Sequence, residues 1–171
     1  MNKNEFTIIR LALKKRITKE IKEIKKLYQA SIDGDSVRDF HNKCDNIPNT
    51  LVIIKSSGNR RFGGFTSETW ESCENCKYKY DKNAFLFSLD KQKIYICKNS
   101  NRAIYCNINY GPCFGNEISI QVNSIIENYL FTYESNTDSS YDFYGDNNAL
   151  SDGNGKSTNA LELEVFQIIF N

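Results

Sequence analysis

Seven short strand-like segments, separated by turn-forming residues, constrain most strongly how this chain can fold. The segments are rich in β-branched or aromatic residues, and one alternates cleanly, with Ile118, Ile120 and Val122 on one face and polar residues on the other. Many strands with short links and few helices predict an α+β, mainly β fold: a two-layer antiparallel β-sandwich flanked by a few short helices. The segments are 50–55, 60–66, 85–89, 93–97, 103–108, 117–122 and 161–170.

The N-terminal segment has a different pattern. Apolar residues recur every three or four positions from Phe6 to Tyr28, which places them on one side of a helix, and lysines occupy its other faces. We therefore predict a basic amphipathic helical extension over residues 1–26, followed by a domain over 27–171. Two roles remain open for the helix: packing on the domain or on a partner's helix, and weak contact of residues 3–26 with an acidic membrane surface.

Two further segments have local signals. Ser36 with Asp39 three residues later is a variant of the capping box and predicts the start of a short helix, which the Asn-rich sequence around Pro48 ends. Residues 135–160 are rich in Ser, Asn, Asp and Gly, which predicts a long surface loop.

The distribution of charge excludes one class of function. Nine of the 22 Lys and Arg residues but only three of the 21 Asp and Glu residues lie within residues 1–30, so the rest of the chain is acidic. An acidic domain does not have the basic footprint of a nucleic-acid-binding protein. There is no signal-peptide pattern and no apolar run of about 20 residues that could span a bilayer, so we expect a cytoplasmic protein with reduced thiols.

The six cysteines do not form a recognisable site. Cys73 and Cys76 form a CxxC pair, but the second close pair that zinc requires is missing, and the pair does not start a helix in a βαβ unit as in thioredoxin. His41 and Cys44 are three residues apart on the short helix, where a buried, inert thiol is the simpler interpretation than a Cys–His nucleophile. We therefore assign no catalytic residue, metal ligand or cofactor.

Glycine pairs and paired carboxylates have structural interpretations. Gly63-Gly64 lacks the Lys-Ser/Thr ending of a phosphate-binding loop, so it indicates a bulge or the close approach of another backbone.

Glu162 and Glu164 share one face of the last strand, and we expect one of them to be buried and paired. The expected partners are Arg60, Arg61 or a backbone donor.

Six short patches occur along the chain in an order that resembles a known family. The patches are Leu27-Tyr28-Gln29-Ala30-Ser31, Phe40-His41-Asn42-Lys43-Cys44-Asp45, Phe62-Gly63-Gly64-Phe65-Thr66, Phe85-Leu86-Phe87-Ser88-Leu89, Tyr110-Gly111-Pro112-Cys113-Phe114-Gly115 and Glu162-Leu163-Glu164-Val165-Phe166. This ordered set resembles the TLDc domain, the C-terminal module of eukaryotic oxidation-resistance proteins, from about residue 24 to residue 170. Trp70 is similar to the tryptophan that commonly follows the Gly-Gly patch.

The resemblance implies a function that the residues alone do not. It implies a β-sandwich with a few helices, protection against oxidative damage and, for several members, binding to the peripheral sector of the vacuolar-type proton ATPase (V-ATPase) and control of its assembly. No catalytic residue is established across the family, so the resemblance favours a monomeric, non-enzymatic interaction module, cytoplasmic or at the cytosolic face of acidic organelles. Candidates for framework or partner-surface roles are Asp45, Phe62, Gly63, Gly64, Phe65, Trp70, Gly111, Pro112, Phe114, Gly115, Glu162 and Glu164.

Two alternatives to this function remain open. The six cysteines allow a thiol-based redox protein that scavenges or senses oxidant through its own thiols. The basic segment 3–26 allows a peripheral membrane adaptor.

Overall fold

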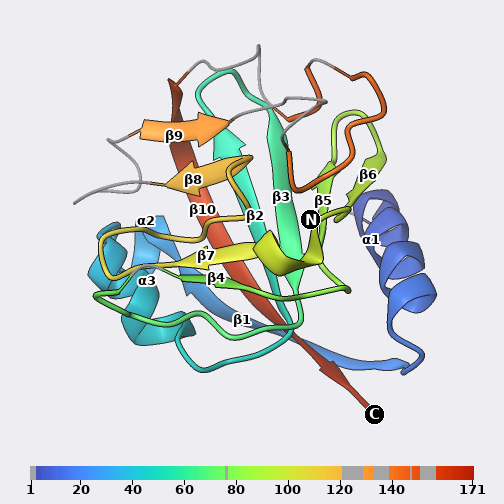
Figure 1. The fold of residues 1–171 in the computed structure, drawn as a ribbon, viewed down its shortest axis with the longest axis horizontal. Coiled ribbons are helices and arrows are strands. Elements are labelled where there is room, and N and C mark those ends of the chain that lie inside the picture. Colours follow the sequence, from blue (N-terminus) through green and yellow to red (C-terminus); the bar gives the residue numbers. More distant parts are fainter. Residues whose placement is uncertain (1–2, 76, 121–128, 133–138, 147, 151–156) are drawn as a thin grey trace.

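An antiparallel sheet of eight strands forms the centre of the structure (Figure 1). The computed structural model describes residues 3–75, 77–120, 129–132, 139–146, 148–150 and 157–171. Seven strands follow the order β6-β5-β3-β2-β10-β9-β8, and β1 also pairs with β10. The strands are β1 (Ile21–Gln29), β2 (Thr50–Ser56), β3 (Arg61–Thr66), β5 (Phe85–Ser88), β6 (Lys93–Ile96), β8 (Ile118–Ile120), β9 (Tyr129–Thr132) and β10 (Ser157–Phe170).

The remaining elements are a second, two-stranded sheet and short helices. The prediction of a mainly β, α+β fold with flanking helices is confirmed, and the strands predicted in the seven segments are all present, with shifted ends. Two short strands, β4 and β9, were not predicted. The elements outside the main sheet are β4 (Lys77–Lys79), β7 (Ile104–Cys106), α1 (Lys3–Arg16), α2 (Ala30–Asp33), α3 (Val37–Cys44) and the 3-10 turn η1 (Ser100–Arg102).

The N-terminal helix is shorter than predicted. It ends at Arg16, and residues 21–29 form β1, so the prediction of a helix as far as residue 26 is wrong. The register of β1 against β10 shifts between Ile21 and Glu23 and again between Lys26 and Tyr28. A bulge adds one residue, so apolar residues three apart can share one face of a strand, as they would on a helix. Pairing with β10 decides between the two structures, because it satisfies the backbone groups along both strands.

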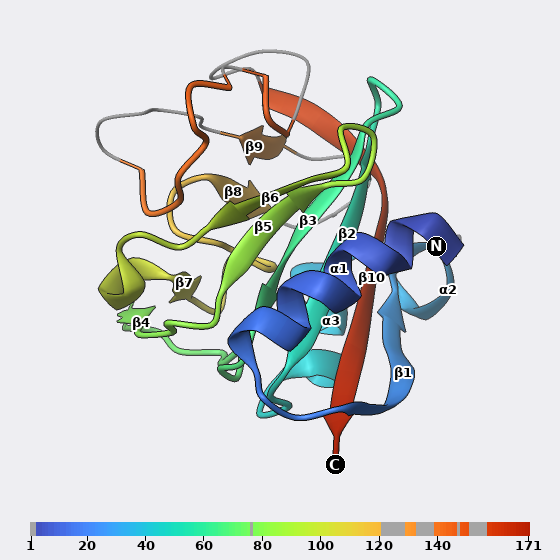
Figure 2. The ribbon, with the colours of Figure 1, turned by 90° about the vertical axis from the view of Figure 1, so that its right-hand side faces the viewer.

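Two buried clusters cover the two faces of the main sheet. On one face, Ile9 and Leu13 of α1 join a cluster with residues of β2, β3, β5 and β10. On the other face, α3, β7 and β8 contribute to a larger cluster that includes Phe40, Trp70 and Phe114. Strand β2 serves both clusters, because its successive side chains point to opposite faces. Figure 2 shows α1 in front of the sheet and α3 behind it.

The Gly63-Gly64 pair lies in β3, where neighbouring atoms leave no room for side chains. A β-carbon on Gly63 would lie 1.9 Å from the carbonyl oxygen of Val52, and one on Gly64 would lie 2.7 Å from the Phe114 ring. The expectation of a close approach by another backbone is therefore confirmed at Gly63. At Gly64, the missing side chain lets an aromatic ring of the second layer pack directly on the sheet.

The segment 135–160 is more than a surface loop. Tyr141, Phe143, Ala149 and Leu150 belong to the larger buried cluster, and residues from Ser157 onward form the start of β10. The prediction of a long surface loop is therefore wrong for these residues, because a few apolar side chains anchor a polar sequence. Residues 135–138, 147 and 151–156 lie outside the described part of the chain.

Candidate functional site

Buried aromatic rings from two of the family-like patches meet at Trp70. The indole of Trp70 packs edge-on against Phe114, with ring centres 5.5 Å apart, and against Phe40, at 5.9 Å. Its Nε1 donates a hydrogen bond of 2.9 Å to Thr50 Oγ1 in β2. Phe62 and Phe65 are also fully buried, on opposite faces of β3. These aromatic candidates therefore lie in the framework of the fold and not on a surface available to a partner.

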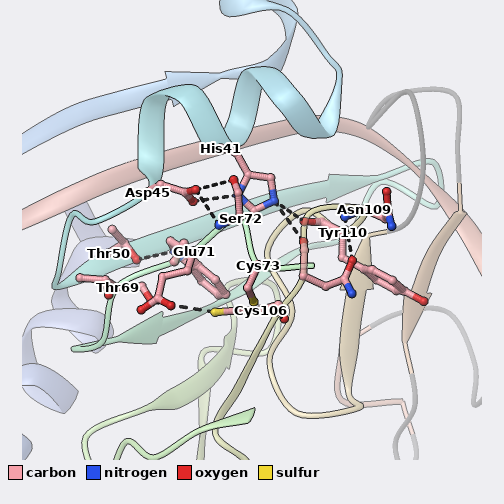
Figure 3. Close-up of polar contacts among 12 residues, drawn as sticks. His41, Asp45, Thr50, Thr69, Glu71, Ser72, Cys73, Cys106, Asn109 and Tyr110 are labelled. Carbon is pink, nitrogen blue, oxygen red and sulfur yellow. Dashed lines mark hydrogen bonds and ion pairs between the residues drawn. The ribbon is translucent and has the colours of Figure 1, made fainter. Parts of the chain in front are cut away.

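His41 is the centre of the polar cluster in Figure 3. The helix α3 begins at the predicted Ser36 cap, where Ser36 and Asp39 form a complete capping box, and it directs His41 into the molecule. The Nδ1 atom lies 2.7 Å from Asp45 Oδ1, and Nε2 lies 2.9 Å from the carbonyl oxygen of Tyr110 and 3.2 Å from that of Asn107. Carboxylate and carbonyl oxygens only accept hydrogen bonds, so the His41 ring is held between groups that accept protons at both of its nitrogens.

Asp45 connects this histidine to the loop that follows β3. Its second carboxylate oxygen accepts hydrogen bonds from the backbone nitrogen of Ser72 (2.8 Å) and from Ser72 Oγ (2.6 Å). Burial alone would raise the pKa of Asp45, but the hydrogen bonds from His41 and Ser72 hold that pKa below its ordinary value. The pair thus ties together the end of α3, the loop at residues 70–72 and the loop at residues 107–110.

The geometry of this cluster does not favour a Cys–His nucleophile. The hydrogen bonds of His41 go to Asp45 and two backbone carbonyls, and Cys44 is fully buried. Burial also raises the pKa of the Cys44 thiol far above its ordinary value. A thiol in this state is not a nucleophile at neutral pH.

Burial raises the pKa of three other described thiols above the ordinary value. Burial raises the pKa of Cys97 and of Cys106 to about 11 and that of Cys113 to about 12. Cys73 is partly exposed and donates a hydrogen bond of 3.1 Å to the Cys106 carbonyl oxygen, whereas Cys76 lies outside the described residues. Within the described ranges, no group of three or more His, Cys, Asp or Glu side chains could hold a metal ion.

A lysine–glutamate group lies next to the His41 cluster. Lys79 of β4 donates hydrogen bonds to the carbonyl oxygen of Thr69 (2.6 Å) and to Thr69 Oγ1 (2.9 Å), and it pairs with Glu71. Lys77 pairs with the same carboxylate, and hydrogen bonds from both lysines lower the pKa of Glu71. These contacts attach β4 to the loop that carries Trp70 and Ser72.

Glu162 and Glu164 join β10 to the neighbouring β1 and α2. Glu162 accepts hydrogen bonds from the backbone nitrogen of Ser31 (3.2 Å), from the Ser31 hydroxyl and from Gln29 Nε2 (3.1 Å). Glu164 pairs with Lys26 Nζ at 2.5 Å. Both carboxylates are only partly buried, so the expected burial of one of them is wrong. The expected backbone donor is that of Ser31, and the paired cation is Lys26 of β1 instead of Arg60 or Arg61.

The loop at residues 111–117 contains a buried carboxylate that the sequence analysis did not single out. The backbone nitrogens of Gly111 and Gly115 donate hydrogen bonds to the carbonyl oxygens of Ile120 and Ala103, and Pro112, which follows Gly111, is buried. Glu117 is fully buried and accepts hydrogen bonds from the backbone nitrogens of Asn116 (3.0 Å) and Ser140 (2.6 Å). Burial raises its pKa to about 7. Only its place on the polar face of an alternating strand was visible in the sequence.

Comparison with known proteins identifies the family. A family model described as the TLDc domain matches residues 1–169, which includes α1 and β1. No curated protein matches the chain. No helix among the described residues is long and apolar enough to cross a membrane. With the family-like patches assembled into one framework and the family model matching nearly the whole length, this chain belongs to the TLDc domain family.

Proposed function

We propose that this chain is a non-enzymatic interaction module that binds the peripheral sector of the V-ATPase, controls its assembly and thereby supports resistance to oxidative damage. The observation that carries the proposal is the family match over residues 1–169, since several members of the family act in this way. Surfaces, and not a catalytic cleft, would then perform the function.

The polar cluster of Figure 3 supports a structural role for the residues most suggestive of chemistry. The hydrogen bonds of His41 and Asp45 go to each other, to Ser72 and to backbone groups, so their polar atoms hold loops in place. Buried polar groups that are fully hydrogen-bonded give a fold its specificity. The cluster is therefore part of the scaffold that presents the surrounding surfaces.

Neither alternative function gains support from the geometry. A thiol-based redox role needs exposed cysteines with lowered pKa, and burial raises the pKa of Cys44, Cys97, Cys106 and Cys113. A membrane adaptor needs a free apolar helix face, and Ile9 and Leu13 of α1 are buried against the sheet.

Direct binding to the purified peripheral sector of the V-ATPase tests the proposal. The full chain is mixed with that sector, and co-elution on size exclusion and the reassembly of ATPase activity are measured. A matched sample carries Gly63→Val, which the 1.9 Å approach of the Val52 carbonyl oxygen should unfold. Survival of cells that express either chain is then measured under hydrogen peroxide.

The two parts of the proposal can fail separately. Co-elution of the pump sector with the intact chain, but not with Gly63→Val, would support the pump interaction. No co-elution of the intact chain at micromolar concentrations would refute it. Equal survival of cells with the intact and the unfolded chain would refute the role in oxidative-stress resistance.

A further inference from the structure

A partly apolar groove lies between α1 and the hairpin formed by β5 and β6. Its volume is about 570 Å³, and the apolar part of its lining comes from Ile8, Leu11 and Ala12 of α1 and from Ile94 and Ile96 of β6. This volume is within the range of roughly 300–1,000 Å³ typical of binding pockets. Leu11 is 56 % exposed and Ile96 is 40 % exposed, so two large apolar side chains face solvent at the groove. Figures 1 and 2 both show α1 beside β6.

The charged side chains at the groove are cationic. Lys15 and Arg16 line it together with the apolar residues, and no Asp or Glu is among its lining residues, all of which the structure describes. Arg16 Nη1 donates a hydrogen bond of 2.7 Å to the carbonyl oxygen of Lys82, which holds its guanidinium in place. An apolar surface with a positive rim is complementary to an apolar ligand with negative charges.

The outer edge of β6 is covered at its C-terminal end and just beyond it, which argues against an added strand there. The backbone nitrogen of Asp142 donates a hydrogen bond to the carbonyl oxygen of Ile96 (2.9 Å). The backbone nitrogen of Lys98 donates one to the carbonyl oxygen of Ser140 (2.8 Å). An extended peptide would need these backbone groups. A helix that lays one apolar face into a groove does not need them, because its backbone hydrogen bonds are internal.

We propose that the groove between α1 and β6 binds an acidic amphipathic helix of a partner protein. Aliphatic side chains at positions i, i+3 or i+4, and i+7 of that helix contact Leu11 and Ile96, and its flanking carboxylates face Lys15 and Arg16. A bilayer fits the groove less well, because Ile9 and Leu13, the apolar anchors that insertion of α1 would need, are already buried. The inference rests on the proposed interaction role but not on the identity of the partner.

Peptide display against the purified full chain tests this inference without the pump. The probe is a displayed library of helical peptides of about 15 residues with random side chains, selected in parallel on the unmodified chain and on Leu11→Glu. The matched control is Ile32→Glu, which changes a more exposed apolar residue of α2 (75 % exposed) outside the groove. Circular dichroism verifies that each variant is folded, and amide chemical shifts locate the binding site.

We expect enrichment of peptides with helically spaced Leu, Ile or Met and flanking Asp or Glu. Their affinity should fall at least about tenfold in Leu11→Glu and stay unchanged in Ile32→Glu, because a buried Leu contact is lost in the first only. Lys15→Glu should weaken the acidic peptides by about three- to tenfold and favour basic ones.

Three results would overturn the inference. They are equal peptide enrichment on the unmodified and Leu11→Glu chains, selected peptides without an acidic bias, and amide shifts that lie outside α1 and β6.

Sedimentation with phosphatidylserine vesicles tests whether a membrane occupies the groove instead. Vesicle binding lost in Leu11→Glu, without peptide binding, would assign the groove to lipid instead. If Leu11→Glu loses peptide binding but still binds the pump, the groove is not the surface that binds the pump, and the two proposals stand or fall independently.

Discussion

Removal of the Asp45 carboxylate should destabilise the protein more than removal of an exposed carboxylate. Asp45→Ala eliminates one hydrogen bond with His41 and two from Ser72, at a side chain that is 17 % exposed. Breaking a buried ion pair by removing one partner costs about 3–5 kcal/mol. Partial access of water to the vacated site favours the lower end, so we expect a loss of about 3 kcal/mol. For a domain of this size, the melting temperature should then fall by roughly 6–12 °C.

Asp45→Asn distinguishes the loss of charge from the loss of hydrogen bonds. The asparagine amide can donate to Nδ1 of a neutral His41 while its oxygen accepts from Ser72, so we expect a cost of only about 1 kcal/mol. The folded protein lowers the pKa of Asp45 below its ordinary value of 3.8. Stability from this carboxylate is therefore present above that value and is lost as the pH falls through the folded pKa. Asp45→Asn should flatten this acid dependence.

Urea unfolding at neutral pH measures these differences, with Trp70 as the reporter. It is the only tryptophan, and its backbone bridges to Asp45 beside the cluster. The matched control is Asp90→Ala, because exposed Asp90 accepts one backbone hydrogen bond, from Arg61. A double-mutant cycle with His41→Ala isolates the pair. Equal losses in Asp45→Ala and Asp90→Ala, or a coupling energy near zero, would refute the reasoning.

Three further predictions concern packing, pH and thiol reactivity. Gly64→Ala should cost about 1–3 kcal/mol in urea unfolding, because its β-carbon overlaps the Phe114 ring, whereas the roomier Gly111→Ala should cost less; equal losses would contradict this. The pKa of Glu117 is raised to about 7, so its contribution to stability is full below its ordinary value of 4.5 and is lost through about pH 7. The free energy of unfolding of the wild type should fall by about 3 kcal/mol over that pH range, whereas that of Glu117→Gln should not. Parallel pH profiles of the two free energies would disprove this prediction. Iodoacetamide should label the partly exposed Cys73 before the buried Cys44 and Cys113, as followed by mass spectrometry over time. Labelling of all three at the same rate would contradict this prediction.

Strand segments and one helix start could be predicted because their signals are local. The alternation at residues 118–120 and the capping box at Ser36 and Asp39 depend only on neighbouring residues, and both appear in the structure. The role of Gly63 was also predictable, since glycine in a strand pattern usually marks a close approach.

The candidate site was less predictable because its contacts are distant in sequence. His41 meets carbonyl groups 66 and 69 residues away, and nothing near it in the chain indicates these partners. Glu117 has the position of a solvent-facing residue in its strand, yet the segment at Ser140 covers it. The groove at the exposed side of α1 could not be predicted either, because residues of β6, distant in sequence, form its other wall.

The sequence by itself determined the mainly β class, most strand positions, the acidic domain and, through its ordered patches, the family. Only the tertiary structure decided whether residues 21–29 form a helix or a strand, because spacings of three and four suit both a helix and a bulged strand. It also decided which carboxylates are buried and which apolar residues remain exposed. These outcomes depend on β10 and on residues 139–146 and 148–150, which come together with the earlier elements only when the whole chain folds.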